Sequence, residues 1–245
     1  MKVLRLVVVI LVASLLTGCV YWRLYQTKLQ LAEFDKNFSI VIADDFTWIF
    51  KDSKLYSDDF TELSKLQPSR IITQKNQQTW RYQFHKVDDK EQLFLPEVNF
   101  FFDLNFNPQQ QLTHWVLSPL FLKLAPPEFL AASLQSLGKG EINQSKRQLK
   151  VAADAMVKIN APLPQKSEII KHLGEPLNIE NHQGLQILHY LFKLETPKVE
   201  TGYEYRTLSK VRLFIDPETE ELVKMSGRFV GLKLSIDYRQ YSRKK

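Results

Sequence analysis

Cysteine is almost absent from this chain of 245 residues, and the single one, Cys19, lies close to the amino terminus. The sequence after Cys19 therefore contains no pair of thiols for a disulfide and no thiol for catalysis. An oxidising compartment would permit disulfides. We expect the folded part of this chain to be held together without them.

A membrane-spanning run is also missing from the start of the chain. The apolar segment from Leu6 to Leu16 has eleven residues, and Arg23 and Lys28 follow soon after it. A transmembrane helix needs roughly 20 apolar residues. Because Lys2 and Arg5 precede this segment and small residues follow it, the layout is that of a secretory signal. We predict that residues 1–18 are a signal peptide.

The residues that end this segment, Leu16-Thr17-Gly18-Cys19, resemble the lipobox of bacterial lipoprotein signals. The resemblance implies cleavage before Cys19, a diacylglyceryl group on its thiol and an acyl chain such as palmitate on the new amino terminus. Val20 stands where an aspartate would favour inner-membrane retention, so we predict the periplasmic face of the outer membrane. The alternatives are an ordinary signal peptide, or an uncleaved helix in which the cysteine occurs by chance.

A strong excess of one charge is missing too. The net charge of +6 includes Lys2 and Arg5, so the chain without its signal carries +4. We therefore predict no nucleic-acid partner. Arg239 and the stretch from Arg243 to Lys245 make a basic tail, which we interpret as a frayed, solvated end of the chain.

Catalytic motifs are not found. The histidines form no H-E-x-x-H pair, Gly138-Lys139-Gly140 lacks the spacing of a phosphate-binding loop, and no G-x-S-x-G occurs. We predict no catalytic, cofactor-binding or metal-ligating residue, and a protein that is not an enzyme. We expect structural roles rather than catalysis for His85, His114, His172, His182 and His189 and for the pairs Asp44-Asp45, Asp58-Asp59 and Asp88-Asp89.

Alternating apolar residues indicate several half-buried strands. Short amphipathic helices are expected before them, one opened by a capping box of Asp59 and Glu62, the other closed by Gly174 in a positive-φ conformation and stopped by Pro176. Further strands are expected within 38–50 and 149–159. The inward-facing positions of the clearest strands are Trp80, Tyr82 and Phe84; Phe100, Phe102, Leu104 and Phe106; and Val211, Leu213 and Ile215.

The chain also repeats itself when it is shifted by 107 to 110 residues. Tyr82 then matches Tyr190, and Phe84 matches Phe192. We predict an α+β fold of two tandem modules, each a short helix packed on an antiparallel β-meander, with an N-terminal helical tether. The expected divisions are a lipid-anchored tether at 19–38, module 1 at 39–125, a linker helix at 126–145 and module 2 at 146–245 with the basic tail.

Residues 167–225 resemble the BamE (SmpA/OmlA) family of outer-membrane lipoproteins. The resemblance depends on Leu173-Gly174-Glu175-Pro176, an aromatic strand around Tyr190 and the stretch from Val211 to Ile215. It implies helices on a three-stranded antiparallel sheet and a role beside the machine that inserts β-barrel proteins. The first copy has Leu66-Gln67-Pro68 where the family has its helix-ending glycine.

Two functions agree with these observations. The first is a non-catalytic scaffold or accessory lipoprotein, held in the membrane through acylated Cys19, that binds envelope proteins. The second is a carrier or sensor of a lipid or another apolar ligand, for which the phenylalanines from Phe100 to Phe102 argue. An apolar cavity would favour the carrier, and packed modules with an exposed apolar patch would favour the scaffold.

Overall fold

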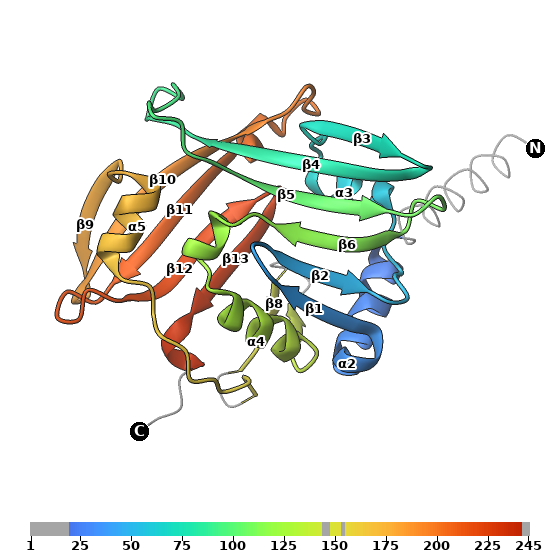
Figure 1. Ribbon diagram of the computed structural model, residues 1–245, viewed down its shortest axis with the longest axis horizontal. Helices are drawn as coiled ribbons and strands as arrows, with labels where there is room; N and C mark the ends of the chain where they lie inside the picture. Colours follow the sequence, from blue (N-terminus) through green and yellow to red (C-terminus); the bar gives the residue numbers. More distant parts are fainter. Residues whose placement is uncertain (1–19, 144–147, 153–154, 242–245) are drawn as a thin grey trace, which may run out of the picture.

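A computed structural model describes residues 20–143, 148–152 and 155–241 of the chain (Figure 1). Residues 1–18 and Cys19, which carry the predicted signal and lipidation site, lie outside the described residues. The last part of the basic tail, from residue 242 onward, also lies outside them.

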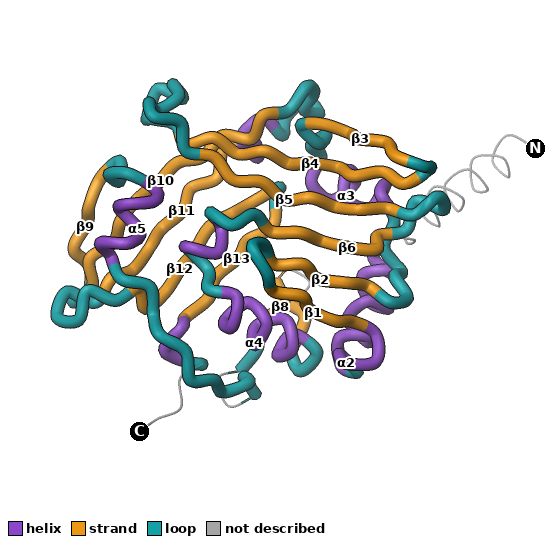
Figure 2. The backbone as a smooth tube through the Cα atoms, viewed as in Figure 1, coloured by secondary structure: helices purple, strands orange, loops and turns teal. Residues whose placement is uncertain are grey.

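The fold is dominated by one antiparallel sheet of eleven strands, curved into a half-barrel (Figure 2). Its order is β1-β2-β6-β5-β4-β10-β11-β12-β13, while β3 pairs with β4 and β9 pairs with β10. β7 and β8 form a separate two-stranded antiparallel sheet. The strands are β1 Phe38–Ile42, β2 Phe46–Phe50, β3 Arg70–Gln74, β4 Gln77–Lys86, β5 Asn99–Phe106, β6 Leu112–Leu117, β7 Glu141–Asn143, β8 Gln148–Lys150, β9 Asn178–His182, β10 Leu185–Glu195, β11 Leu208–Ile215, β12 Leu222–Phe229 and β13 Leu232–Asp237.

Short helices pack around this sheet. Residues 20–32 form the first described helix, and three short 3-10 turns occur further along the chain. Residues 38–50, where we expected a strand, form the hairpin of β1 and β2. Of the described residues within 149–159, where a second one was expected, only the end of β8, up to Lys150, belongs to a strand. The other helices are α2 Phe34–Asn37, α3 Ser57–Ser64, α4 Pro127–Leu137 and α5 Lys166–Leu173, and the 3-10 turns are η1 Phe121–Lys123, η2 Glu204–Thr207 and η3 Tyr238–Gln240.

The prediction of two tandem helix-on-meander modules is wrong, because the strands of both halves belong to one sheet. The join is the antiparallel pair of β4 and β10, in which Lys86 faces Phe192 and Gln83 faces Glu195. Each half would otherwise leave these strands with unpaired backbone groups at an edge. Pairing them satisfies both edges and merges the halves into one body.

The order of elements nevertheless recurs along the chain. A helix, a hairpin and two further strands appear as α3, β3, β4, β5 and β6, and again as α5, β9, β10, β11 and β12. The first residues of these pairs of elements are 108 to 110 positions apart, as between Gln77 and Leu185 or between Leu112 and Leu222. The two halves therefore share the order of their elements, but they pack together around one core and do not form two separate units.

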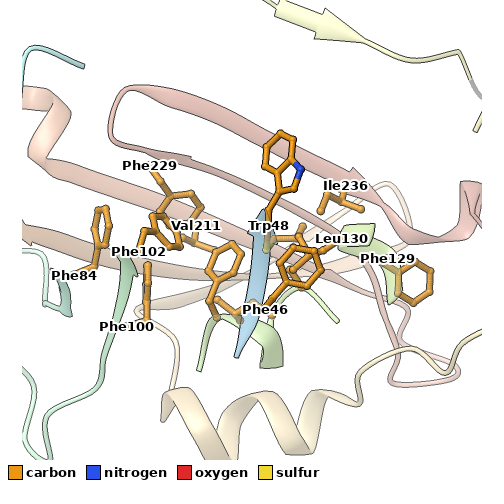
Figure 3. Packing of buried hydrophobic residues seen from close by; sticks show 14 of the residues in the cluster. Phe46, Trp48, Phe84, Phe100, Phe102, Phe129, Leu130, Val211, Phe229 and Ile236 are labelled. Carbon is orange, nitrogen blue, oxygen red and sulfur yellow. The ribbon is translucent and has the colours of Figure 1, made fainter. Parts of the chain in front are cut away.

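Aromatic rings fill the interior of the half-barrel (Figure 3). Phe100 of β5 lies 4.9 Å from Phe192 of β10 and 5.7 Å from Phe229 of β12, measured between ring centroids. Phe121 of η1 lies 5.0 Å from Phe102. Strands that are far apart in the sheet order thus meet across one core, which is the second reason why the halves are not separate modules.

The helix ends follow the predicted chemistry in one case and depart from it in another. Gly174 has a φ of +68° directly after α5, which confirms the predicted positive-φ end. In the first half Lys65 takes this place with a φ of 62°. The capping box of α3 uses Tyr56 as N-cap and Asp59 as the third helical residue, so the predicted pairing of Asp59 with Glu62 is wrong.

Candidate docking surfaces

The histidines are distributed over four strands of the sheet and α5. His85 is placed between two carboxylates, with Nδ1 at Glu97 and Nε2 3.3 Å from Glu195. Burial lowers the pKa of His114. Among the described residues, no group of three or more histidine, cysteine or acidic side chains is arranged to hold a metal ion.

The carboxylate pairs lie at turns and at a helix start. Asp44 and Asp45 form the turn between β1 and β2, and Asp58 and Asp59 lie in the first turn of α3. In the loop after β4, one Asp88 oxygen accepts backbone hydrogen bonds of 2.9 and 2.8 Å from residues 90 and 92. Gly138 ends α4, as expected for a helix end rather than a phosphate loop.

Hollows occur at the molecular surface. One, of about 290 Å³, lies beside Gly184 and Pro217. A second, of about 410 Å³, lies over the end of β10, between the loop after β4 and the loop after β10. Neither hollow supports the carrier hypothesis, because both open to solvent. The lining of the first includes polar side chains, and that of the second includes charged ones.

The second hollow belongs to what we call the seam surface, formed by loops 87–98 and 196–207 where the two halves of the sheet join. Leu95 is 90% exposed, Leu93 58% and Tyr205 57%. A salt bridge of 2.7 Å between Lys193 and Glu91 crosses the hollow's lining. Of loop 87–98, Glu91 lines the hollow, and the same loop carries the exposed Leu93 and Leu95. Exposed leucines on a loop that borders a half-polar hollow are typical of a protein-binding surface.

The helix at residues 20–32, predicted as a tether, packs against the half-barrel. The Arg23 guanidinium binds both oxygens of Asp59, with Nε 3.0 and 2.9 Å from them, and lies over the Tyr56 ring. The Asp59 side chain is 1% exposed. At the other end of the helix, a Cβ added to Gly138 would lie 2.2 Å from the backbone oxygen of Leu31, so only glycine permits this contact.

The opposite side of this helix carries what we call the aromatic stripe. Tyr21, Trp22, Tyr25 and Leu29 are between 45% and 60% exposed. The rings of Trp22 and Tyr25 are stacked with centroids 5.8 Å apart. Positions 21, 25 and 29 follow one another at helical spacing, so they share one face. The helix therefore carries an apolar, aromatic face toward solvent in addition to the face that packs against the protein.

A buried lysine connects the two halves of the sheet. The Lys86 ammonium donates hydrogen bonds of 2.7 and 2.6 Å to the backbone oxygens of Leu173 and Glu175, at the carboxyl end of α5. It lies 4.4 Å from the ring of Phe94 and 5.2 Å from that of Tyr190. Burial lowers the pKa of Lys86. The same burial raises the pKa of Tyr190, whose hydroxyl donates to the Gly174 oxygen.

The sequence analysis did not predict the contact of Arg23 with Asp59 or that of Lys86 with the end of α5, although the position of each cation indicated one. Lys86 occupies the next inward position after Trp80, Tyr82 and Phe84, which is unusual for a cation. Arg23 shares the buried helix face with residues 27 and 31. A cation on an inward face requires a partner, and the partners here are 36 and 87 residues away in the sequence.

Comparisons with protein-family models, with curated proteins and with solved structures find no match to this chain. In the part of the chain that the structure describes, no helix has the length and apolar character to cross a membrane.

Proposed function

We propose that this protein is a bacterial lipoprotein, anchored through acylated Cys19 to the periplasmic face of the outer membrane. It acts there as a non-catalytic scaffold or accessory protein in envelope assembly or maintenance. The observation that carries the scaffold proposal is the seam surface, where Leu93, Leu95 and Tyr205 are exposed on a body with a filled core. Side chains that are costly to leave in water favour burial by a protein partner.

The filled interior favours a scaffold over a lipid carrier. A carrier of an apolar ligand needs an enclosed apolar space of several hundred Å³. Inside this half-barrel Phe84, Phe100, Phe102, Phe121 and Phe229 contact one another instead. The resemblance of residues 167–225 to the BamE family stays a prediction, and it agrees with an envelope-protein partner.

The anchor is tested by replacing its acceptor. Cys19→Ser removes the thiol that takes the diacylglyceryl group, so incorporation of labelled palmitate should stop and uncleaved precursor should accumulate. Mass spectrometry of the purified protein should locate the acyl groups on residue 19 of the unchanged chain. Labelling that persists in the serine variant would show that the acyl chain is elsewhere and would refute the anchor.

The scaffold proposal is tested at the seam surface in intact cells. A photo-crosslinking amino acid at Leu95 or Tyr205 should capture an envelope protein, and Leu95→Glu should reduce capture from position 205 at least tenfold. An ionised carboxylate at the centre of an apolar contact typically costs more than about 1.4 kcal/mol of binding, which corresponds to that factor. Circular dichroism should show unchanged folding, since Leu95 is exposed.

Ile179→Glu is the matched control, because Ile179 is also an exposed apolar residue but lies on β9, outside the seam loops. It should leave crosslinking at the seam unchanged. Capture that is insensitive to Leu95→Glu would refute the seam surface as the binding site. Stoichiometric phospholipid on the purified protein, with no protein crosslinks, would favour the carrier.

A further inference from the structure

The aromatic stripe of helix 20–32 has no covering element among the described residues. Trp22 is 60% exposed and Tyr21 57%, whereas Thr27 and Leu31 on the other side are 7% and 6% exposed. The outward face from residue 20 to 32 bears no carboxylate, and the charged residues of the helix are Arg23 and Lys28. A surface helix that faced only water would carry polar side chains there.

The chemistry of the stripe matches the headgroup region of a bilayer. Tryptophan and tyrosine place an apolar ring and a polar group in one side chain, and both are enriched at the boundary between lipid and water. From Tyr21 to Leu29 the stripe extends about 12 Å along the helix, at 1.5 Å per residue. A helix with this pattern lies in the interface, with its apolar face immersed by roughly 5–10 Å.

The chain that precedes the helix places it beside a membrane. The apolar segment ends at Leu16 and the lipid acceptor is Cys19, so the stripe begins two residues after the acceptor. A lipid on Cys19 holds residue 20 at the bilayer surface, and so does an uncleaved apolar segment. Arg23 is bound to Asp59 on the protein side of the helix, so Lys28 is the cationic side chain of the helix that complements anionic headgroups.

We propose that Tyr21, Trp22, Tyr25 and Leu29 insert into the headgroup region of the bilayer and thereby set the orientation of the whole protein on the membrane. The proposal deepens the function proposed above and takes the anchor near residue 19 from it. The Arg23–Asp59 ion pair and the Gly138 contact attach the helix firmly to the half-barrel. Insertion of the stripe therefore orients the body, and with it the seam surface, whose loop 87–98 lies far from this helix in Figure 1.

The test measures the depth of Trp22. The full chain, extracted from membranes of the producing cells, is reconstituted into vesicles of phosphatidylethanolamine and phosphatidylglycerol whose acyl chains carry bromine near the headgroup. Bromine quenches tryptophan emission only at close range, so we expect quenching that Trp22→Phe removes. Trp115→Phe is the matched control and should leave quenching unchanged, because Trp115 packs against Trp48 and Phe60 and its indole nitrogen has no hydrogen-bond partner to lose.

A second variant tests the orientation. The triple change Tyr21→Ser, Trp22→Ser and Tyr25→Ser affects exposed positions, so the fold should persist by circular dichroism while the reconstituted body loses its fixed orientation. Trypsin cleavage of the reconstituted protein at Lys28 should rise at least fivefold, whereas Arg23 stays bound to Asp59. Unchanged cleavage together with absent Trp22 quenching would overturn the proposal.

Failure of the anchor is distinguished by a separate measurement. If mass spectrometry finds no acyl group on Cys19, the proposed anchor is refuted. Bromine quenching of Trp22 still tests whether the stripe inserts into the bilayer. If the protein is recovered from the soluble fraction, it is added directly to the brominated vesicles. Trp22-dependent quenching then supports the stripe, and its absence refutes it.

Discussion

Arg23→Ala is expected to lower the free energy of unfolding by about 3–5 kcal/mol, because it leaves the Asp59 carboxylate buried without its counter-ion. The Asp59 side chain is 1% exposed, and it also accepts a 2.8 Å hydrogen bond from the Tyr56 backbone nitrogen. One backbone donor does not replace a bidentate guanidinium. Denaturant unfolding of the purified variant measures the loss, and limited proteolysis should show that helix 20–32 has detached.

Lys36→Ala is the matched control for this prediction. Lys36 forms an ion pair with Glu33 near the same helix, but its side chain is 74% exposed. Exposed pairs typically contribute about 0–1 kcal/mol, so little change is expected. In a double-mutant cycle, the variant with both Arg23→Ala and Asp59→Asn should be more stable than Arg23→Ala alone, because the unpaired buried charge is removed. A loss below about 1 kcal/mol for Arg23→Ala would show that the helix is held mainly by its apolar contacts.

Lys86→Met is expected to cost about 2–4 kcal/mol of unfolding free energy. Methionine keeps the apolar stem, but it removes the donor for the backbone oxygens of Leu173 and Glu175 and the positive charge at the carboxyl end of α5. Hydrogen exchange of the α5 amides should accelerate more than exchange of the β4 amides. Equal acceleration in both elements would contradict a local role for the lysine.

The pH dependence of Lys86→Met follows from the sign of the pKa shift. Burial lowers the pKa of Lys86, so between its folded and unfolded pKa values the unfolded chain binds more protons. The contribution of Lys86 to stability therefore rises with pH across that window, and Lys86→Met should remove this rise. Lys171→Met on α5 is the control, because its side chain is 67% exposed and its ion pair with Glu168 contributes little.

Local patterns in the sequence predicted the faces of the strands correctly. Trp80, Tyr82 and Phe84 are buried on one side of β4. A helix, α4, lies within the range 126–145 where we expected one, but it ends at Leu137 and strand β7 follows from Glu141. Gly174 was predictable because a helix that ends in a residue with positive φ strongly favours glycine. These features depend on neighbours within a few residues, which a sequence displays directly.

The error in the fold has a physical cause. Whether β4 ends a module or pairs with β10 depends on hydrogen bonds between backbone groups, which every residue except proline carries in the same form. Alternating side chains report which face of a strand is buried and contain little information on its neighbouring strand. The predicted division into modules therefore rested on a recurrence that is real in element order and absent from the packing.

By itself, the sequence determined the strand faces and the positive-φ end of α5, because each depends on residues adjacent in the chain. The lipid acceptor at Cys19 stays a prediction from the sequence. Only the tertiary structure decided that both halves share one core and that Arg23 and Lys86 find their partners in distant elements. It also decided which apolar side chains remain outside, among them Trp22 and Leu95. Exposure is a property of the packed chain, since an apolar residue is identical in sequence whether another element covers it or not.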